Sequence, residues 1–404
     1  MGFLSSLSMF LSVIATLLGI ITTTSGFYTT FRSWREGKNQ NKSSIYLGSQ
    51  IVWRLRHSRW RNKRRWILFS SITFFLLLIS LVGILVMPIL LPHLTLNPSN
   101  DTLDDSIIRV VRWAPKGSLL AYGDSNGKVL VWDVPTKRTL FTSQRQFVEV
   151  SRIVWSPDAK YIAIAYMDGI VQVLNISSTR YILTYKGHGG GVSAMSWSPN
   201  GKYIISAEED GVVRIWQFNT GKEQNDYKGH SDSVQSVVWS PDGKYIASAE
   251  DDKIWLWDVS TGKNIWFYQS SGVQTLVWSP DGKYIASAGG DVTVQVWNTI
   301  PGHFSSIPRI YSQHKELVKD IAWLPNGKYI VSVSDDGTIQ IWDPSNANDI
   351  VSPYHDSFLY RDGASFTLTS VTCSPDNSSI AFIHEEFYLS GYTISRVRIV
   401  NLII

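Results

Sequence analysis

The residues of this sequence that could most readily form a catalytic or binding site are three short runs of acidic residues. They are Glu208, Glu209 and Asp210; Glu250, Asp251 and Asp252; and Asp335 with Asp336. Clustered carboxylates could catalyse hydrolysis if two of them converged on one cleft and one had a raised pKa. They could instead attract a basic segment of a partner or a cation. The runs contain no recognisable convergent pair, which favours binding over catalysis.

The signatures of common catalytic and metal sites are absent from the sequence. No HExxH, CxxC, GxSxG or Walker-type loop occurs. The single cysteine, Cys373, excludes an internal disulfide and a cysteine-rich metal site. Pairs such as Asp210-Gly211 are typical of tight turns, because glycine tolerates positive φ. We therefore expect no enzyme activity, no cofactor and no bound metal.

The acidic runs belong to a unit that recurs along most of the chain. In its clearest copy, residues 229–259, turn residues separate three apolar runs of strand length, which predicts an antiparallel meander. A marker residue in the first run recurs every 39–50 residues. The markers are Trp113, Trp155, Trp197, Trp239, Trp278, Trp323 and Cys373. One such sheet cannot bury both of its faces alone, so the seven copies must pack against one another.

The pattern of these repeats resembles the WD-repeat β-propeller family. The Gly-His pair at 229–230, the Trp-Asp pair at 257–258 and the period of about 40–45 residues carry the resemblance. It covers residues 107–402 and implies an all-β, seven-bladed propeller with four strands in each blade.

The resemblance also implies a hydrogen-bonded group that braces a blade. It joins the Gly-His histidine, a second-strand serine, an aspartate in the following turn and the third-strand tryptophan. The matching sets are His188, Ser206, Asp210 and Trp216; His230, Ser248, Asp252 and Trp257; and His314, Ser332, Asp336 and Trp342. A histidine and an aspartate stay buried in a β core only when they are paired. We therefore interpret these residues as structural.

In propellers of this family, the acidic turns lie on the same face as the Gly-His loops. The remaining carboxylates on these turns are candidate partner-binding residues. They are Glu208, Glu209, Glu250, Asp251 and Asp335. The alternative interpretation is that they are solvated turn residues.

The seventh repeat departs most from the pattern and ends on its third strand. Cys373 and Val400 replace the usual tryptophans, and we expect a long connection from His384 to Ser395. That connection could cap the array or bind a partner. The missing outer strand is predicted to come from residues 92–98 of the linker 92–106, because an unpaired strand edge is a liability.

The N-terminal part differs from the propeller in charge and hydropathy. Residues 1–91 carry a net charge of +10 and the remainder −6. Residues 67–91 contain no charged side chain, which predicts a transmembrane helix. Residues 3–24, within the segment 1–27, predict a first transmembrane helix, with a cleaved signal peptide as the alternative.

The basic loop 28–66 is densest in Lys and Arg at 54–65. It could bind anionic lipid or act as a topology signal, and we expect no nucleic-acid partner. Because basic loops stay in the cytoplasm, we expect the propeller on the extracytoplasmic side of the membrane. Most WD-repeat propellers are cytosolic or nuclear, which leaves the opposite orientation open.

These observations predict a membrane-anchored, non-catalytic scaffold that binds a protein or peptide on a face of the propeller. Two other functions stay open. The chain could be a sensor that relays binding through the helical hairpin, or a propeller hydrolase.

Overall fold

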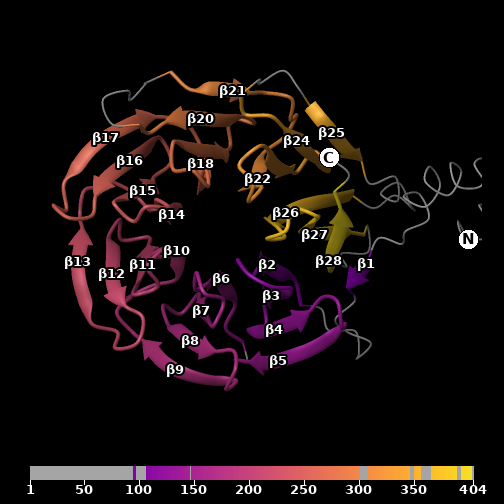
Figure 1. The fold of residues 1–404 in the computed structure, drawn as a ribbon, viewed down its shortest axis with the longest axis horizontal. Coiled ribbons are helices and arrows are strands. Elements are labelled where there is room, and N and C mark those ends of the chain that lie inside the picture. Colours follow the sequence, from indigo (N-terminus) through magenta and orange to yellow (C-terminus); the bar gives the residue numbers. More distant parts are fainter. Residues whose placement is uncertain are drawn as a thin grey trace, which may run out of the picture. The chain divides into compact units, whose positions relative to one another are not determined.

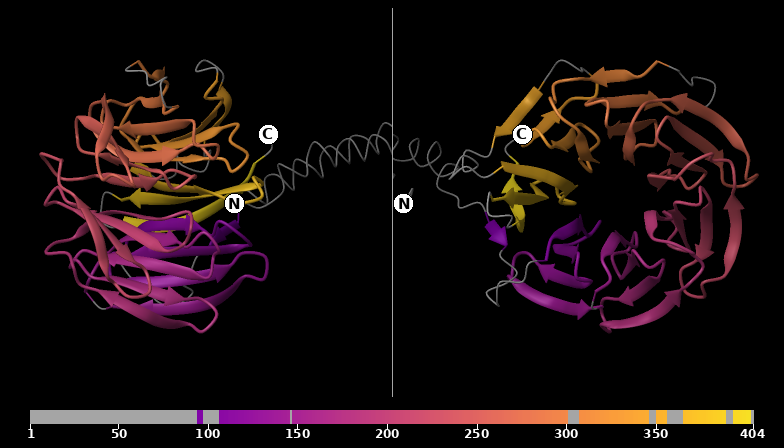
Figure 2. Two further views of the ribbon diagram at one scale, coloured as in Figure 1. Left: turned by 60° about the vertical axis from the view of Figure 1, so that its left-hand side comes forward. Right: turned by 180° about the vertical axis from the view of Figure 1, so that it is seen from behind.

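Seven antiparallel four-stranded sheets follow one another around a ring in the computed structural model (Figure 1). The structure describes residues 94–96, 106–145, 147–300, 307–345, 350–355, 365–388 and 393–402. Each sheet forms one blade, and its first strand lies nearest the centre of the ring. The views in Figure 2 show the ring from the side and from behind. The predicted seven-bladed all-β propeller is confirmed.

The first four blades each use four consecutive strands. Blade one comprises β2 (Ile108–Trp113), β3 (Leu119–Asp124), β4 (Lys128–Asp133) and β5 (Arg138–Gln144). Blade two comprises β6 (Val150–Trp155), β7 (Tyr161–Tyr166), β8 (Val171–Asn175) and β9 (Arg180–Tyr185). Blade three comprises β10 (Val192–Trp197), β11 (Tyr203–Glu208), β12 (Val213–Gln217) and β13 (Glu223–Tyr227). Blade four comprises β14 (Ser236–Trp239), β15 (Tyr245–Ala249), β16 (Lys253–Asp258) and β17 (Asn264–Gln269).

The last three blades complete the ring. Blade five comprises β18 (Val273–Trp278), β19 (Tyr284–Gly289), β20 (Val294–Asn298) and β21 (Arg309–Tyr311). Blade six comprises β22 (Val318–Trp323), β23 (Ile330–Ser334), β24 (Thr338–Trp342) and β25 (Ile350–His355). Blade seven comprises β26 (Ser365–Cys373), β27 (Ser379–Phe387), β28 (Thr393–Asn401) and, as its fourth strand, β1 (Leu94–Leu96).

The Ser-Pro-Asp-Gly sequence sets the turn between the first and second strands. In blade four, the Ser240 hydroxyl donates to Asp242 at 2.7 Å and accepts the backbone N–H of Tyr245 at 2.9 Å. The Asp242 carboxylate also accepts the N–H of Lys244 at 3.0 Å. Gly243 has a φ of 74°, which a side chain would oppose. These bonds span only a few residues, which is why the turn was visible in the sequence.

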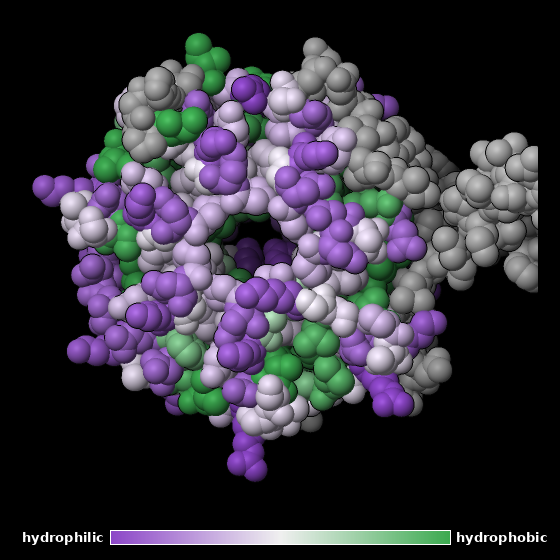
Figure 3. All heavy atoms as spheres, viewed as in Figure 1, coloured by the Kyte–Doolittle hydropathy of each residue, from purple (hydrophilic) through white to green (hydrophobic). Residues whose placement is uncertain are grey.

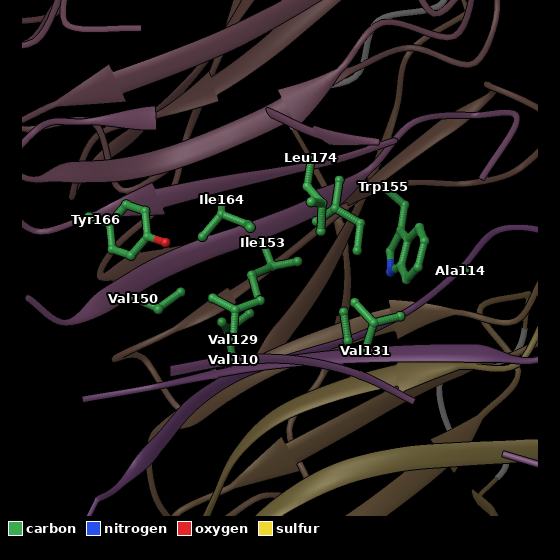
Figure 4. Close-up of a cluster of buried hydrophobic side chains, with 12 residues drawn as sticks. Val110, Ala114, Val129, Val131, Val150, Ile153, Trp155, Ile164, Tyr166 and Leu174 are labelled. Carbon is green, nitrogen blue, oxygen red and sulfur yellow. The ribbon is translucent and has the colours of Figure 1, made fainter. Parts of the chain in front are cut away.

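The hydrophobic core lies between successive blades and not inside any one of them. Seven buried clusters occupy the seven boundaries between blades. Figure 4 shows the cluster between blades one and two, where Val110 and Val129 of blade one pack against Val150 and Ile153 of blade two. Trp155 also donates its indole N–H to the backbone oxygen of Arg112 at 3.0 Å. The marker tryptophans therefore join neighbouring sheets.

The ring closes as predicted, with a strand from the linker. β1 pairs antiparallel with β28, which places Leu94 opposite Ile399 and Leu96 opposite Val397. The outer edge of β28 is thereby covered by a segment about 300 residues away in the sequence.

The predicted long connection from His384 to Ser395 is wrong. Its two ends are strand residues, because β27 and β28 have nine residues each and pair from Ser379–Asn401 out to Phe387–Thr393. Strands in the other blades have three to seven residues. Blade seven therefore extends its sheet where a loop was expected.

The membrane predictions concern another part of the chain. Segments 1–27, 28–66 and 67–91 lie outside the described residues. Within the described ranges, no helix has both the length and the apolar character that a membrane span requires.

Candidate functional site

The Gly-His loops and the turns between second and third strands meet on one face of the propeller. In blade three, the His188 ring lies between two polar partners. Its Nε2 lies 2.6 Å from the Ser206 hydroxyl, and its Nδ1 lies 3.3 Å from a carboxylate oxygen of Glu208. The Trp216 indole N–H donates to the same Ser206 oxygen at 2.9 Å.

These contacts indicate which atoms of Ser206 and His188 carry the protons. Trp216 can only donate, so the single proton of Ser206 is available for the Nε2 atom of His188. The Nδ1 atom then carries a proton and donates to Glu208. Burial lowers the pKa of His188, although the Glu208 carboxylate acts in the opposite direction. The histidine is therefore a neutral link between a carboxylate and a serine.

Blade four repeats this arrangement with Glu250. His230 Nε2 lies 2.7 Å from the Ser248 hydroxyl, and Nδ1 lies 3.5 Å from Glu250. Glu250 also accepts the backbone N–H of Ser231 at 2.9 Å and the indole N–H of Trp255 at 3.1 Å. Burial acts to raise the pKa of Glu250, but these hydrogen bonds lower it by more, so the net shift of the pKa is downward.

Blade six uses an aspartate for the same task. His314 Nδ1 lies 3.0 Å from Asp336, and His314 Nε2 lies 2.8 Å from the Ser332 hydroxyl. Asp336 also accepts the backbone N–H of Lys315 at 3.0 Å. Burial acts to raise the pKa of Asp336, but hydrogen bonds from His314 and neighbouring groups hold it well below its usual value.

The predicted acids of blades three and four need correction. Asp210 and Asp252 were expected beside the histidines, but Glu208 and Glu250 hold those positions. Asp210 instead pairs with Arg214 at 2.6 Å on the surface. A glutamate two residues after the serine lies at the strand end, and its longer side chain reaches the histidine from there.

The same finding overturns two of the predicted partner-binding residues. Glu208 is 4% exposed and Glu250 is 1% exposed, so neither carboxylate is available to a partner. Glu209 and Asp251 are exposed, whereas Asp335 is half-buried and pairs with Lys319 at 3.0 Å. In the described part of the chain, no cationic side chain lies within ion-pairing distance of Glu209 or Asp251.

Sequence reasoning missed one exposed acid on this face, Asp232. It lies in the Gly-His loop of blade four, and a Cβ atom on Gly211 would lie 3.1 Å from its backbone oxygen. The turn that carries Glu209 therefore touches the loop that carries Asp232. The signal in the sequence was an aspartate two residues after His230, which the search for acidic runs passed over.

The remaining members of the predicted sets lie where expected, with one difference. Trp257 donates to Ser248 at 2.7 Å, as Trp216 does to Ser206. The Trp342 indole N–H has no hydrogen-bond partner among the described residues, and its ring stacks on Tyr311 at 4.6 Å between centroids.

Comparison with known families identifies the propeller more closely than the repeats alone. The family model described as the IFT122 first beta-propeller matches residues 149–382, from blade two into blade seven. A comparison with curated proteins finds no match. Propellers of the matching family are non-catalytic and act as scaffolds for protein–protein interaction. Because the match covers more than half of its residues, the chain belongs to the IFT122 first β-propeller family.

Proposed function

We propose that this chain is a membrane-held scaffold whose propeller binds a basic segment of a partner protein at the boundary of blades three and four. One observation carries the proposed binding site. Glu209 and Asp232 lie at that boundary, and Asp251 lies on the next turn, between β15 and β16 of blade four. All three are exposed, and no cationic side chain of the described residues pairs with any of them. We call these three residues the acidic edge.

The surroundings of the acidic edge favour a basic ligand. Two neighbouring carboxylates on this face already have cations, since Asp210 pairs with Arg214 and Asp168 pairs with Arg145. The loops are held by the buried braces, so their carboxylates are preorganised and lose little freedom on binding. Complementary charge would raise the association rate and select the partner.

Charge reversal at Glu209 tests this site. Binding of a fluorescent octalysine peptide to the full chain should weaken about 5- to 20-fold in Glu209→Lys, because one attraction becomes a repulsion. The matched control is Glu316→Lys, since Glu316 is exposed in the Gly-His loop of blade six on the same face. Equal binding by both variants would contradict a site at blades three and four.

The membrane part of the proposal is supported by composition. Residues 67–91 form an uncharged apolar segment of bilayer length, and 3–24 form a second candidate. Arg and Lys at 54–65 would lie against anionic headgroups, with the basic loop in the cytoplasm and the propeller on the opposite side.

Two measurements test the anchor and its orientation. The full chain should stay with membranes through an alkaline carbonate wash, whereas a chain lacking 67–91 should lose most of this retention. With a tag after Ile404, external protease should remove the tag from intact cells. A tag that is protected until the membrane is breached would reverse the proposed orientation.

A further inference from the structure

The centre of the ring contains a polar cavity that the binding face described above does not include. The first strands of the blades enclose about 600 Å³. Figure 3 shows the opening, with hydrophilic residues around its mouth and deeper inside. One position of the repeat, three residues before the marker, supplies several of its lining side chains. These are Arg152, Ser236, Thr275, Asp320 and Ser370.

Among the described residues that line the cavity, Asp320 is the aspartate, and its carboxylate is already saturated with hydrogen bonds. One carboxylate oxygen of Asp320 accepts from Arg112 at 3.2 Å, from the Ser370 hydroxyl at 3.1 Å and from the N–H of Val371 at 3.1 Å. The other accepts from Thr275 at 3.3 Å and from the N–H of Ile321 at 3.0 Å. Asp320 and Arg112 therefore neutralise each other.

Arg152 is left as the unpaired cation of the cavity lining. The lining also contains Arg109 and Lys319, but Arg109 pairs with Glu149 at 3.1 Å and Lys319 pairs with Asp335 at 3.0 Å. Its guanidinium donates to the backbone oxygen of Ser151 at 2.7 Å, and no carboxylate of the described residues lies within ion-pairing distance. Burial lowers the pKa of Arg152 to about 10, and the nearby positive charge of Arg112 adds to this effect. The group is still charged at neutral pH, so the cavity lining carries one positive charge that no carboxylate of the described residues pairs with.

Hydroxyl groups with a donor to spare line the same cavity. Ser236 accepts the backbone N–H of Leu276 at 3.0 Å, and Ser196 accepts that of Trp239 at 3.4 Å. A hydroxyl whose oxygen is used in this way can still donate its own proton. The cavity therefore offers a guanidinium and hydroxyl donors without a matching acceptor.

We propose that the central cavity binds an oxyanion, a carboxylate or a phosphate group, through Arg152 with Ser236 as a further donor. A partly buried cation is costly unless an anion pairs with it, and Arg152 is partly buried. A guanidinium suits both oxyanions because it donates two parallel hydrogen bonds. The volume admits a small free anion or the acidic end of a peptide. This site is separate from the acidic edge, which attracts the opposite charge.

Isothermal titration of the full chain with inorganic phosphate and with pentaglutamate tests the proposal, at constant ionic strength in chloride. We expect saturable binding of at least one probe at one site per chain, and at least a tenfold loss of affinity in Arg152→Gln. The control is Arg145→Gln, because Arg145 pairs with Asp168 near the Gly-His face and does not line the cavity. Its affinity should match that of the unmodified chain.

Each outcome decides the question. Binding of phosphate alone identifies a small phosphate-bearing ligand, and binding of pentaglutamate alone identifies an acidic peptide end. Binding that persists in Arg152→Gln belongs elsewhere, for example to the basic residues 54–65, and overturns the proposal. Absence of saturable binding by either probe also overturns it. Circular dichroism of Arg152→Gln checks that the fold is kept, which we expect because the change removes an unpaired charge.

Discussion

Blades three and six each hold a buried histidine with a carboxylate, but the carboxylate belongs to a different type of residue in each blade. In both, a buried histidine contacts a serine through Nε2 and a carboxylate through Nδ1. The carboxylate belongs to Glu208 at a strand end in blade three and to Asp336 in the turn in blade six. In both blades it also accepts backbone N–H groups from the residues after the histidine.

The residue two positions after the serine decides between these arrangements. In blade six that residue is Ser334, which is small and whose hydroxyl accepts the N–H of Asp336 at 3.1 Å. In blade three it is Glu208, which fills the space beside His188 and leaves Asp210 to Arg214. The brace is therefore defined by contacts to the histidine and its loop, and its acid can occupy different positions in the sequence.

The largest effect should come from removing the bracing glutamate. We expect Glu208→Ala to reduce the free energy of unfolding by about 2–4 kcal/mol, because His188 and two backbone N–H groups lose their acceptor and Arg214 loses one of its two carboxylates. Asp210→Ala should cost less than about 1 kcal/mol, since it breaks a surface ion pair. Urea denaturation of the full chain measures both. If Asp210→Ala reduced the free energy of unfolding more than Glu208→Ala, Asp210 would be the bracing acid of blade three.

Blade six should show the same contrast with an aspartate in the sensitive position. Asp336→Ala should cost about 2–3 kcal/mol, because the carboxylate accepts from His314, Lys315 and Thr338. Asp335→Ala removes only the contact with Lys319 and should cost about 1 kcal/mol or less. Similar losses of free energy of unfolding in the two variants would mean that Asp336 stabilises the fold no more than Asp335 does.

The serines should differ by a smaller amount. Ser206 has two side-chain partners, His188 and Trp216, so Ser206→Ala should cost about 2 kcal/mol. Ser332 lacks the tryptophan contact, and Ser332→Ala should cost about 1 kcal/mol. Both can be read from shifts of the denaturation midpoint. If Ser332→Ala is the more damaging change, the tryptophan contact of blade three does not stabilise it.

The smallest effect is a pH dependence that blades three and four should share. Burial lowers the pKa of His188 and His230 in the folded state, so the unfolded chain binds protons first. Their contribution is complete above the ordinary histidine value of 6.5 and is lost as the pH falls through the folded value. Denaturation midpoints between pH 8 and 5 should therefore decline, and less so in the double variant His188→Asn and His230→Asn. Identical slopes would place the titration elsewhere.

The features that could be predicted from the sequence rest on short-range chemistry or on repetition. The turn at Ser240–Gly243 is held by hydrogen bonds across two to five residues, so the local sequence is enough to predict it. Seven copies of one unit implied seven blades. The missing fourth strand of the last copy implied a donor strand, and Leu94–Leu96 supplies it.

The identity of the bracing acid was not predictable in this way. The runs at 208–210 and 250–252 offer several carboxylates within a few residues, and the family pattern favoured the aspartates. Side-chain reach and burial select among them, and both depend on how the second strand ends against the histidine loop. The extended β27 and β28 hairpin likewise depends on pairing along its full length.

The repeat, the turns and the number of blades follow from the sequence alone, because each of these depends on residues close together in the chain. Which charges meet depends on the tertiary structure. Arg112 contacts Asp320 and Ser370, which lie 208 and 258 residues further along the chain, and Arg152 is left beside them without a carboxylate partner in the described residues. Closing the ring brings these first strands around one cavity, and burial there makes an unpaired charge costly in free energy.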